Sequence, residues 1–245
     1  MCIGSFLNVC IFRLPTSKSI SDPSRSICPN CGDTIRFYDN IPVLSFLVLK
    51  GRCRQCNTPI SCRYPIVEIL SGLFALCVFL KFGLTVQGFI FYAFISCLLV
   101  VTFIDIDHQI IPNVITLPGI PIFFLASFAV PDVTYVDSIL GLLAGGGSLY
   151  AVGWAYYLIK KKEGMGGGDI KLLAMIGALL GWKGVVFTIF TGSAVGTFAG
   201  LIVMASKRLI DAKLRIPFGP FLSIGAISYV FFGEKVIFWY LNMLR

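Results

Sequence analysis

Apolar runs about as long as a membrane-crossing helix alternate along this chain with short polar or charged segments. A helix needs about 20 apolar residues to cross the hydrocarbon core of a bilayer. The runs that reach or approach this length are residues 65–82, 87–104, 113–130, 138–159, 170–182, 185–205 and 219–242. Residues 1–12 are apolar but shorter, and we interpret them as the second half of a first span whose upstream part is missing or unusually short. The pattern predicts an all-α polytopic membrane protein with about eight transmembrane helices.

The composition agrees with a membrane setting. Hydrophobic residues make up 57% of the 245 residues, and charged residues only 13%. Soluble domains carry about 25% charged residues. A soluble fold of this size would need more polar surface than these side chains supply, so the composition excludes an ordinary soluble domain.

The distribution of basic residues predicts the topology. Residues 15–64 form the only long polar stretch, and eight of the twenty lysines and arginines lie between residues 13 and 64. If this stretch is cytoplasmic and the spans alternate, sixteen of the twenty fall on the cytoplasmic side, as the positive-inside rule requires. The net charge of +8 is then mostly topological, and we predict no nucleic-acid partner. Lys160, Lys161 and Lys162 are interpreted as an anchor at anionic lipid head groups.

Carboxylates directly beside apolar runs are the first candidate chemistry. Asp105 and Asp107 follow the 87–104 span, together with the only histidine, His108, and Asp169 opens the 170–182 span after a run of glycines. The predicted topology brings these acids to the same side of the membrane. Two carboxyl groups held close together cannot both ionise cheaply. The ionised one can take a proton from water while the protonated one polarises a carbonyl, so the set favours hydrolysis of a peptide bond.

Other interpretations of these acids remain open on residue types alone. Asp169 can be a helix cap, and Asp105 and Asp107 can be ordinary loop acids beside the membrane. His108 is interpreted as a polar loop residue. Buried carboxylates also form the proton or cation relays of transporters and ion channels, but relay acids lie near mid-span, whereas these lie at span ends.

Two cysteine pairs are the second candidate chemistry. Cys28-x-x-Cys31 and Cys53-x-x-Cys56 are separated by 21 residues, a spacing typical of a structural zinc site with four thiolate ligands. Four protein ligands leave no open position, so the metal would be structural. A redox-active dithiol would need only one pair and a thioredoxin-like pattern, which is missing. A polar domain of about 50 residues needs such a staple to fold.

These motifs together resemble the type IV prepilin peptidases, membrane aspartyl proteases with a glycine-x-glycine-aspartate motif. Asp105-x-Asp107-(x)4-Pro112-Asn113 and Gly166-x-Gly168-Asp169 are similar to the two aspartate motifs of that family. The resemblance extends to three further segments, which are Gly4–Val9 with Arg13-Leu14-Pro15, Asp39–Ser45 and Ile60–Glu68.

The resemblance implies a function and assigns residues to it. Asp105 and Asp169 match the catalytic aspartates. The family cleaves the basic leader from prepilins or pseudopilins, then methylates the new amino terminus with S-adenosylmethionine. A site at the cytoplasmic face of the inner membrane is implied, with the substrate's amino-terminal helix lying in the lipid bilayer. The cofactors would be zinc and S-adenosylmethionine. The chain would consist of a partial first helix (residues 1–14), a cytoplasmic zinc domain (15–64) and the protease domain (65–245).

The methyl donor has no assigned site in the sequence. No glycine loop of the nucleotide-binding kind is present, so its binding residues remain unknown. Glu68 and Lys50-Gly51-Arg52 are candidates for methyltransfer or substrate contact, although an acid at the start of a span also suits the helix dipole. A related protease without methyltransferase activity is the alternative function.

Overall fold

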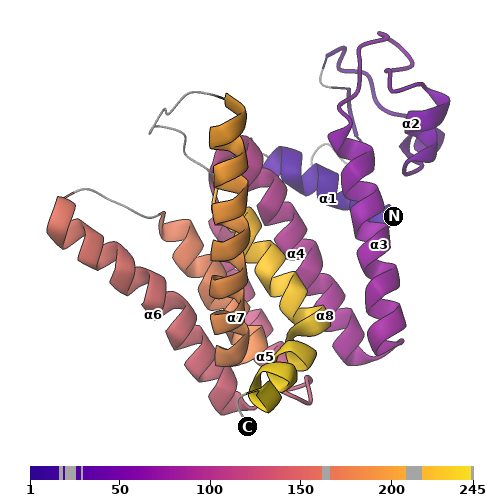
Figure 1. Cartoon of the computed structure of the whole chain (residues 1–245). Coiled ribbons are helices and arrows are strands. Elements are labelled where there is room, and N and C mark those ends of the chain that lie inside the picture. The colour runs from indigo at the N-terminus through magenta and orange to yellow at the C-terminus, as the bar shows by residue number, and fades with distance from the viewer. Residues whose placement is uncertain (17–18, 20–25, 29, 162–165, 208–216, 244–245) are drawn as a thin grey trace. The chain divides into compact units, whose positions relative to one another are not determined.

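The computed structural model describes residues 1–16, 19, 26–28, 30–161, 166–207 and 217–243, and these are mostly helical (Figure 1). They contain no strand, only two isolated bridges, so the predicted all-α class is confirmed for this part of the chain. The chain divides into two compact units, Met1–Val100 and Val101–Arg245. Lys162 of the predicted lipid anchor and the basic residues within 208–216 lie outside the described residues.

In the first unit, α1 (Cys2–Arg13) packs against α3 (Arg63–Phe82) with the two backbones close together. A Cβ on Gly4 would lie 2.7 Å from the Cα of Glu68, so only glycine fits there. The buried Asn8 side chain donates a hydrogen bond of 3.0 Å to the Tyr64 carbonyl. Small residues and interhelical hydrogen bonds are how helices associate in membranes. The unit also contains η1 (Leu14–Thr16), η2 (Phe37–Asn40), α2 (Leu44–Val48) and the amino-terminal part of α4 (Val86–His108).

The second unit begins within α4 and contains the remaining helices. These are α5 (Asn113–Ser127), α6 (Tyr135–Lys160), α7 (Gly167–Lys207) and α8 (Gly219–Met243). A capping box starts α6: the Thr134 hydroxyl accepts from the Asp137 amide, and the Asp137 carboxylate accepts from the Thr134 amide. This exchange satisfies donors that a helix amino terminus otherwise leaves unpaired.

A single glycine divides α7 into two helical halves. Gly181 has a φ of 70° and a ψ of −179°, a conformation outside the helical region that residues with side chains rarely adopt. The two halves of α7 run in different directions (Figure 1). A Cβ at this position would also lie 3.1 Å from the Cβ of Asp137. The neighbouring Trp182 indole donates to Asp137 at 3.1 Å, which ties the break in α7 to the start of α6.

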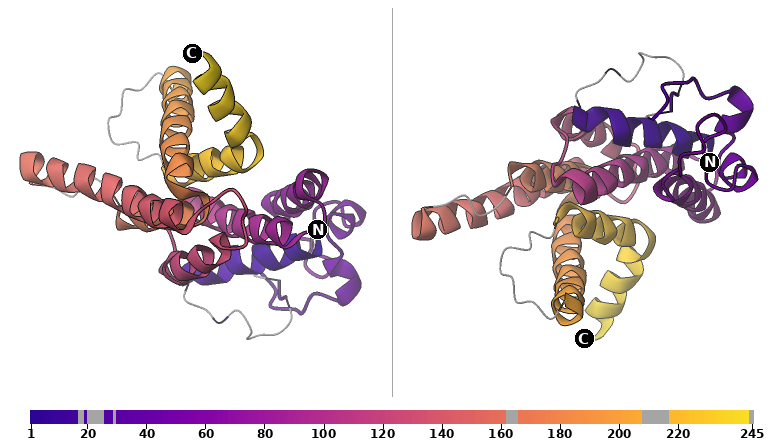
Figure 2. Two further views of the ribbon diagram at one scale, coloured as in Figure 1. Left: turned by 90° about the horizontal axis from the view of Figure 1, so that it is seen from below. Right: turned by 90° about the horizontal axis from the view of Figure 1, so that it is seen from above.

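Glycines also let the first half of α7 approach α6 closely. A Cβ on Gly177 would lie 2.1 Å from the carbonyl oxygen of Gly141, and one on Gly145 would lie 2.4 Å from that of Leu173. Such backbone contact excludes any side chain. The second half of α7 packs against α8, as both views in Figure 2 show, and a Cβ on Gly192 would lie 3.0 Å from the Phe221 carbonyl.

Four described helices are long and apolar enough to cross a membrane, namely Arg63–Phe82, Val86–His108, Tyr135–Lys160 and Gly167–Val203. Three shorter apolar helices accompany them, Cys2–Thr16, Asn113–Ser127 and Gly219–Gly233. The two predicted spans 170–182 and 185–205 lie within the one broken helix α7. The arrangement with about eight spans therefore remains a prediction.

One predicted boundary is wrong. The span expected to stop at residue 104 continues to His108, so Asp105 and Asp107 lie in the last turn of α4 and not in a loop. Gln109 then takes a positive φ of 55°, and the chain leaves the helix.

Candidate active site and metal site

Asp105 is buried in the last turn of α4. Only 5% of the residue is exposed, and its Oδ2 accepts a hydrogen bond of 3.0 Å from the backbone N–H of Gly219. Gly219 is the first residue of α8, where backbone N–H groups have no partner inside the helix. An N–H group and the positive end of a helix dipole both favour a carboxylate at this position. The amino terminus of α8 is therefore part of the Asp105 environment.

Asp107 lies on a different side of the same helix. Two residues along a helix correspond to a rotation of about 200°. Asp107 is exposed, and so is His108. The structure thus separates the two acids that the sequence places together, and Asp105 is the one that faces the interior of the second unit.

Asp169 lies in the first turn of α7, half-buried, and its carboxylate interacts electrostatically with that of Asp105. The Ile111 side chain lies close to a glycine beside each aspartate: Gly168 precedes Asp169 in the chain, and the N–H of Gly219 binds Asp105. A Cβ on Gly168 would lie 2.8 Å from the Cβ of Ile111, and one on Gly219 would lie 3.3 Å from its Cδ1. The two aspartates predicted from the sequence are therefore brought together.

A cross-link between α5 and α7 borders this site. Lys171 donates a hydrogen bond of 2.8 Å to the side-chain oxygen of Asn113. Asn113 begins α5 and Lys171 follows Asp169 by two residues. The bond therefore fixes the start of α7 relative to the loop that contains Ile111.

Gly219 is the site residue that the sequence analysis missed. It is flanked by proline on one side and Phe218 on the other, in Pro217-Phe218-Gly219-Pro220, which indicates a turn into a helix. This signal locates the start of α8. It does not reveal that the Gly219 N–H meets Asp105, a residue 114 positions earlier in the chain.

The four predicted metal-ligating cysteines form one cluster in the first unit. The Sγ atoms of Cys28, Cys31, Cys53 and Cys56 all lie within 4.8 Å of one another. Those of Cys28 and Cys56 are 3.9 Å apart. Bonds of about 2.3 Å from a tetrahedral zinc ion separate neighbouring sulfurs by about 3.8 Å. The cluster could therefore hold a metal ion, and its size and ligand type are compatible with zinc.

The two halves of the cluster repeat one backbone pattern. The amide of Cys28 donates to the Asp33 carbonyl, and that of Gly32 donates to Cys28, both at 2.9 Å. Twenty-five residues later, Cys53 donates to Thr58 at 2.9 Å and Asn57 donates to Cys53 at 3.0 Å. Gly32 and Asn57 both take the left-handed conformation that such a tight turn requires. Each C-x-x-C pair is therefore held on its own turn, with both thiols on one side.

Polar neighbours surround the sulfurs. The Thr58 hydroxyl, 3.2 Å from the Cys56 sulfur, lowers the pKa of Cys56 to about 6, assisted by the Thr58 amide and the Asn30 side chain. The Asp33 amide lowers the pKa of Cys31, but desolvation and then the neighbouring Cys28 and Cys56 outweigh it and raise that pKa to about 12. Crowded thiolates repel one another, and a bound cation removes that repulsion. The donor set therefore fits a divalent metal.

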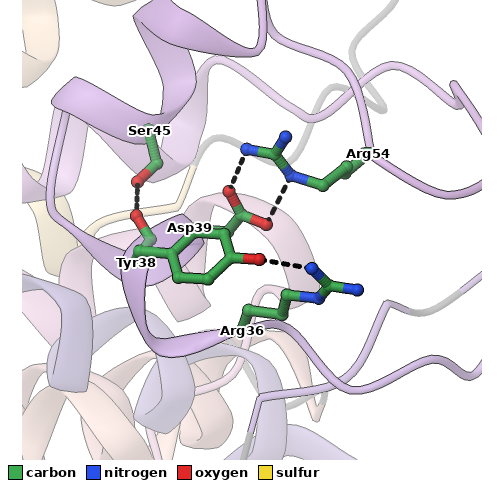
Figure 3. A network of polar contacts seen from close by, with 5 residues as sticks. All are labelled: Arg36, Tyr38, Asp39, Ser45 and Arg54. Atoms are coloured by element: carbon green, nitrogen blue, oxygen red, sulfur yellow. Dashed lines mark hydrogen bonds and ion pairs between the residues drawn. The ribbon is translucent and has the colours of Figure 1, made fainter.

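Charged groups clamp the second C-x-x-C turn to η2 (Figure 3). Arg54, which lies between Cys53 and Cys56, binds both carboxylate oxygens of Asp39 at 2.8 and 2.6 Å. The hydrogen-bonded ion pair with Arg54 lowers the pKa of the Asp39 carboxyl group. The guanidinium groups of Arg36 and Arg54 also lie over the Tyr38 ring. Planar two-point contacts of this kind fix orientation as well as distance.

Glu68, a candidate for methyltransfer, is engaged in a structural contact. Glu68 is 9% exposed, and its Oε2 accepts a hydrogen bond of 2.8 Å from the Val43 amide. Val43 has a φ of 63°, which is strained for a β-branched residue. The carboxylate therefore holds the turn that begins α2.

The structure has two neighbouring aspartates on helices that are able to cross a membrane. This arrangement is typical of a membrane aspartyl peptidase. Comparison with known proteins identifies the family. A model described as the bacterial peptidase A24 N-terminal domain matches residues 1–82, and one described as the type IV leader peptidase family matches residues 92–201. The chain belongs to the type IV leader peptidase family and is an enzyme of that class. Family membership removes the transporter or ion channel as an interpretation of the aspartates.

Several similar proteins cover nearly the whole chain. A prepilin leader peptidase/N-methyltransferase of Aeromonas hydrophila is 36% identical over 98% of this chain and 90% of its own length. Proteins of the same description from Pseudomonas aeruginosa and Pseudomonas putida are 35% and 33% identical, over 98% and 96% of this chain and 90% and 88% of their own lengths. No solved structure is significantly similar to this chain.

Proposed function

We propose that this protein cleaves the basic leader from prepilins or pseudopilins and then methylates the new amino terminus with S-adenosylmethionine. Three relatives that align over almost the full chain are described as prepilin leader peptidase/N-methyltransferases. The observation that carries the proposal is the proximity of the buried Asp105 to Asp169 at the ends of two candidate membrane spans.

Asp105 and Asp169 would share the hydrolytic step. One carboxylate takes a proton from water as the water oxygen bonds to the scissile carbonyl carbon, and the other carboxyl group donates its proton to the carbonyl oxygen. Collapse of the resulting diol breaks the C–N bond, and the leaving amine takes a proton from the carboxyl pair. The Gly219 N–H holds Asp105 in place for this exchange, because it donates a hydrogen bond to Oδ2.

The membrane arrangement follows from the positions of these groups. We infer about eight spans in the inner membrane, with residues 15–64 and the aspartates on the cytoplasmic side. The apolar helix of the substrate would lie in the bilayer beside the enzyme, and its leader would reach the aspartates at the cytoplasmic boundary. Asp105 and Asp169 both lie in end turns of their helices, as this geometry requires.

A structural zinc ion would complete the domain of residues 15–64. Cys28, Cys31, Cys53 and Cys56 supply four thiolates and leave no position for a substrate or water, so the metal would hold the two turns together.

Substitution of each aspartate tests the peptidase assignment. We expect Asp105→Asn and Asp169→Asn each to abolish leader cleavage of a purified prepilin while the protein stays folded in membranes. Asp107→Asn is the matched control, because this residue is exposed on another side of α4, and it should retain cleavage. Full cleavage by either of the first two variants would exclude the proposed pair.

The products distinguish the two activities. The prepilin is incubated with the enzyme, with and without S-adenosylmethionine, and weighed by mass spectrometry. We expect a leader-free product without the donor and the same product carrying one added methyl group with it. A cleaved product that never gains a methyl group would show that the protein is a protease without methyltransferase activity.

A further inference from the structure

The short helix α2 presents an apolar face to its surroundings. Leu44, Leu47 and Val48 are 60%, 64% and 74% exposed, and α2 has no buried residue. Their spacing of three and four residues puts them on one side of the helix. On another side, Phe46 packs against Gly51, where an added Cβ would lie 3.0 Å from its ring. Three adjacent large apolar side chains in water are unfavourable by their transfer free energy.

A hydrogen bond ties the start of α2 to a candidate membrane span. The Val43 amide, which immediately precedes α2, donates to the Glu68 carboxylate at 2.8 Å. Glu68 is the sixth residue of α3, about 8 Å along the helix from Arg63. The 20 residues of α3 would span about 30 Å, which equals the hydrocarbon thickness of a bilayer. Val43 therefore lies about 8 Å along α3 from the end at which this helix enters the bilayer, within the depth of about 5–10 Å to which interfacial helices insert their apolar face.

Basic residues lie directly after the apolar face. An open groove of about 600 Å³ is lined by Val48, Leu49, Lys50, Arg52, Cys53, Arg54 and Asn57. Arg54 is paired with Asp39, whereas Lys50 and Arg52 are exposed and have no ion pair within the described part of the chain. The groove thus combines apolar side chains with two cations available to an anionic ligand.

We propose that α2 is an interfacial anchor: Leu44, Leu47 and Val48 insert into the bilayer, and Lys50 and Arg52 bind the phosphate of an anionic phospholipid. An apolar helix face next to basic residues is the pattern of segments that lie in the membrane interface. The depth set by Glu68 suits the apolar face of an interfacial helix, and the basic groove begins directly after that face. A basic leader peptide would be repelled by the same groove, so charge complementarity favours the lipid.

Photocrosslinking tests the apolar face. Benzoylphenylalanine is introduced at Leu47 in the full-length protein, reconstituted in vesicles of phosphatidylethanolamine and phosphatidylglycerol, and irradiated. We expect adducts with the mass of a phospholipid. Thr34, exposed after the first cysteine turn and outside the groove, is the control position and should give few lipid adducts. Equal lipid labelling at both positions, or adducts at position 47 to protein alone, would overturn the proposal.

Lipid retention tests the groove. Native mass spectrometry of the detergent-purified protein measures bound phosphatidylglycerol against phosphatidylcholine. We expect Arg52→Gln to weaken phosphatidylglycerol binding about fivefold, the effect of removing one cation near anionic head groups. Arg36→Gln removes the same charge from the same domain outside the groove and should leave retention unchanged. If the two variants behave alike, the groove is not the lipid site.

Discussion

At the residue scale, the candidate active site depends on a backbone group as much as on the two carboxylates. Asp105 is nearly inaccessible, and its one described hydrogen-bond partner is the Gly219 amide at 3.0 Å. A Cβ on Gly219 would lie 2.6 Å from Oδ2 of Asp105, closer than any side-chain contact allows. Glycine therefore lets the helix amino terminus approach the carboxylate without displacing it.

The variant Gly219→Ala should lower prepilin cleavage strongly while the helical content stays unchanged. The added methyl group pushes the Asp105 carboxylate away from its amide donor, and a hydrogen bond to a charged group contributes about 1.5–3 kcal/mol. That corresponds to a fall in kcat/KM of about 10- to 100-fold. Gly147→Ala is the control, because no atom lies within 4 Å of its added Cβ. Wild-type cleavage by Gly219→Ala would mean that this contact does not position Asp105.

The sequence predicted the residue types of the site better than their local relations. Asp105 and Asp169 could be paired because the order of the spans puts both on one side of the membrane. The four cysteines could be grouped because their spacing is itself a local motif. The role of Gly219 could not be predicted, since a glycine shows its purpose only when the group that approaches it is known. Asp107 could have been separated from Asp105 by helix geometry, but only once α4 was known to continue past residue 104.

At the element scale, hydropathy located the helices to within a few residues, but it did not reveal the break in α7, which depends on the backbone conformation of one glycine. The predicted span 65–82 compares with Arg63–Phe82, and 138–159 with Tyr135–Lys160. An average over apolar residues cannot detect that Gly181 leaves the helical region, because the residues around it remain apolar. The break is nevertheless what allows the two halves of α7 to pack against different partners, α6 and α8.

The variant Gly177→Ala should destabilise the contact between α6 and α7. Its Cβ would lie 2.1 Å from the Gly141 carbonyl oxygen, so the helices must separate or shift. Overpacking of this kind costs about 1–3 kcal/mol, which should appear as a lower midpoint of thermal unfolding in detergent. Gly146→Ala is the matched control on α6, because its Cβ would make an ordinary contact of 3.4 Å with Ala174. Equal midpoints for both variants would show that the close approach is unimportant.

At the scale of the whole molecule, the two candidate sites belong to different compact units. The cysteine cluster lies within Met1–Val100, whereas Asp105, Asp169 and Gly219 all lie within Val101–Arg245. The candidate active site is therefore formed by residues of one unit alone. The metal, if it is structural, should stabilise the other unit without providing any group to the peptidase reaction.

The variant Cys31→Ser should lose the metal and retain prepilin cleavage. Three thiolates bind zinc more weakly than four, so we expect elemental analysis to find about one zinc ion per chain in the wild type and much less in the variant. Limited proteolysis should then cut between residues 26 and 60, because the two cysteine turns have lost the ion that joins them. Cys62→Ser removes an exposed thiol outside the cluster and should keep both the zinc and the protection. Cleavage lost together with zinc would show instead that the peptidase site depends on the metal-bound unit.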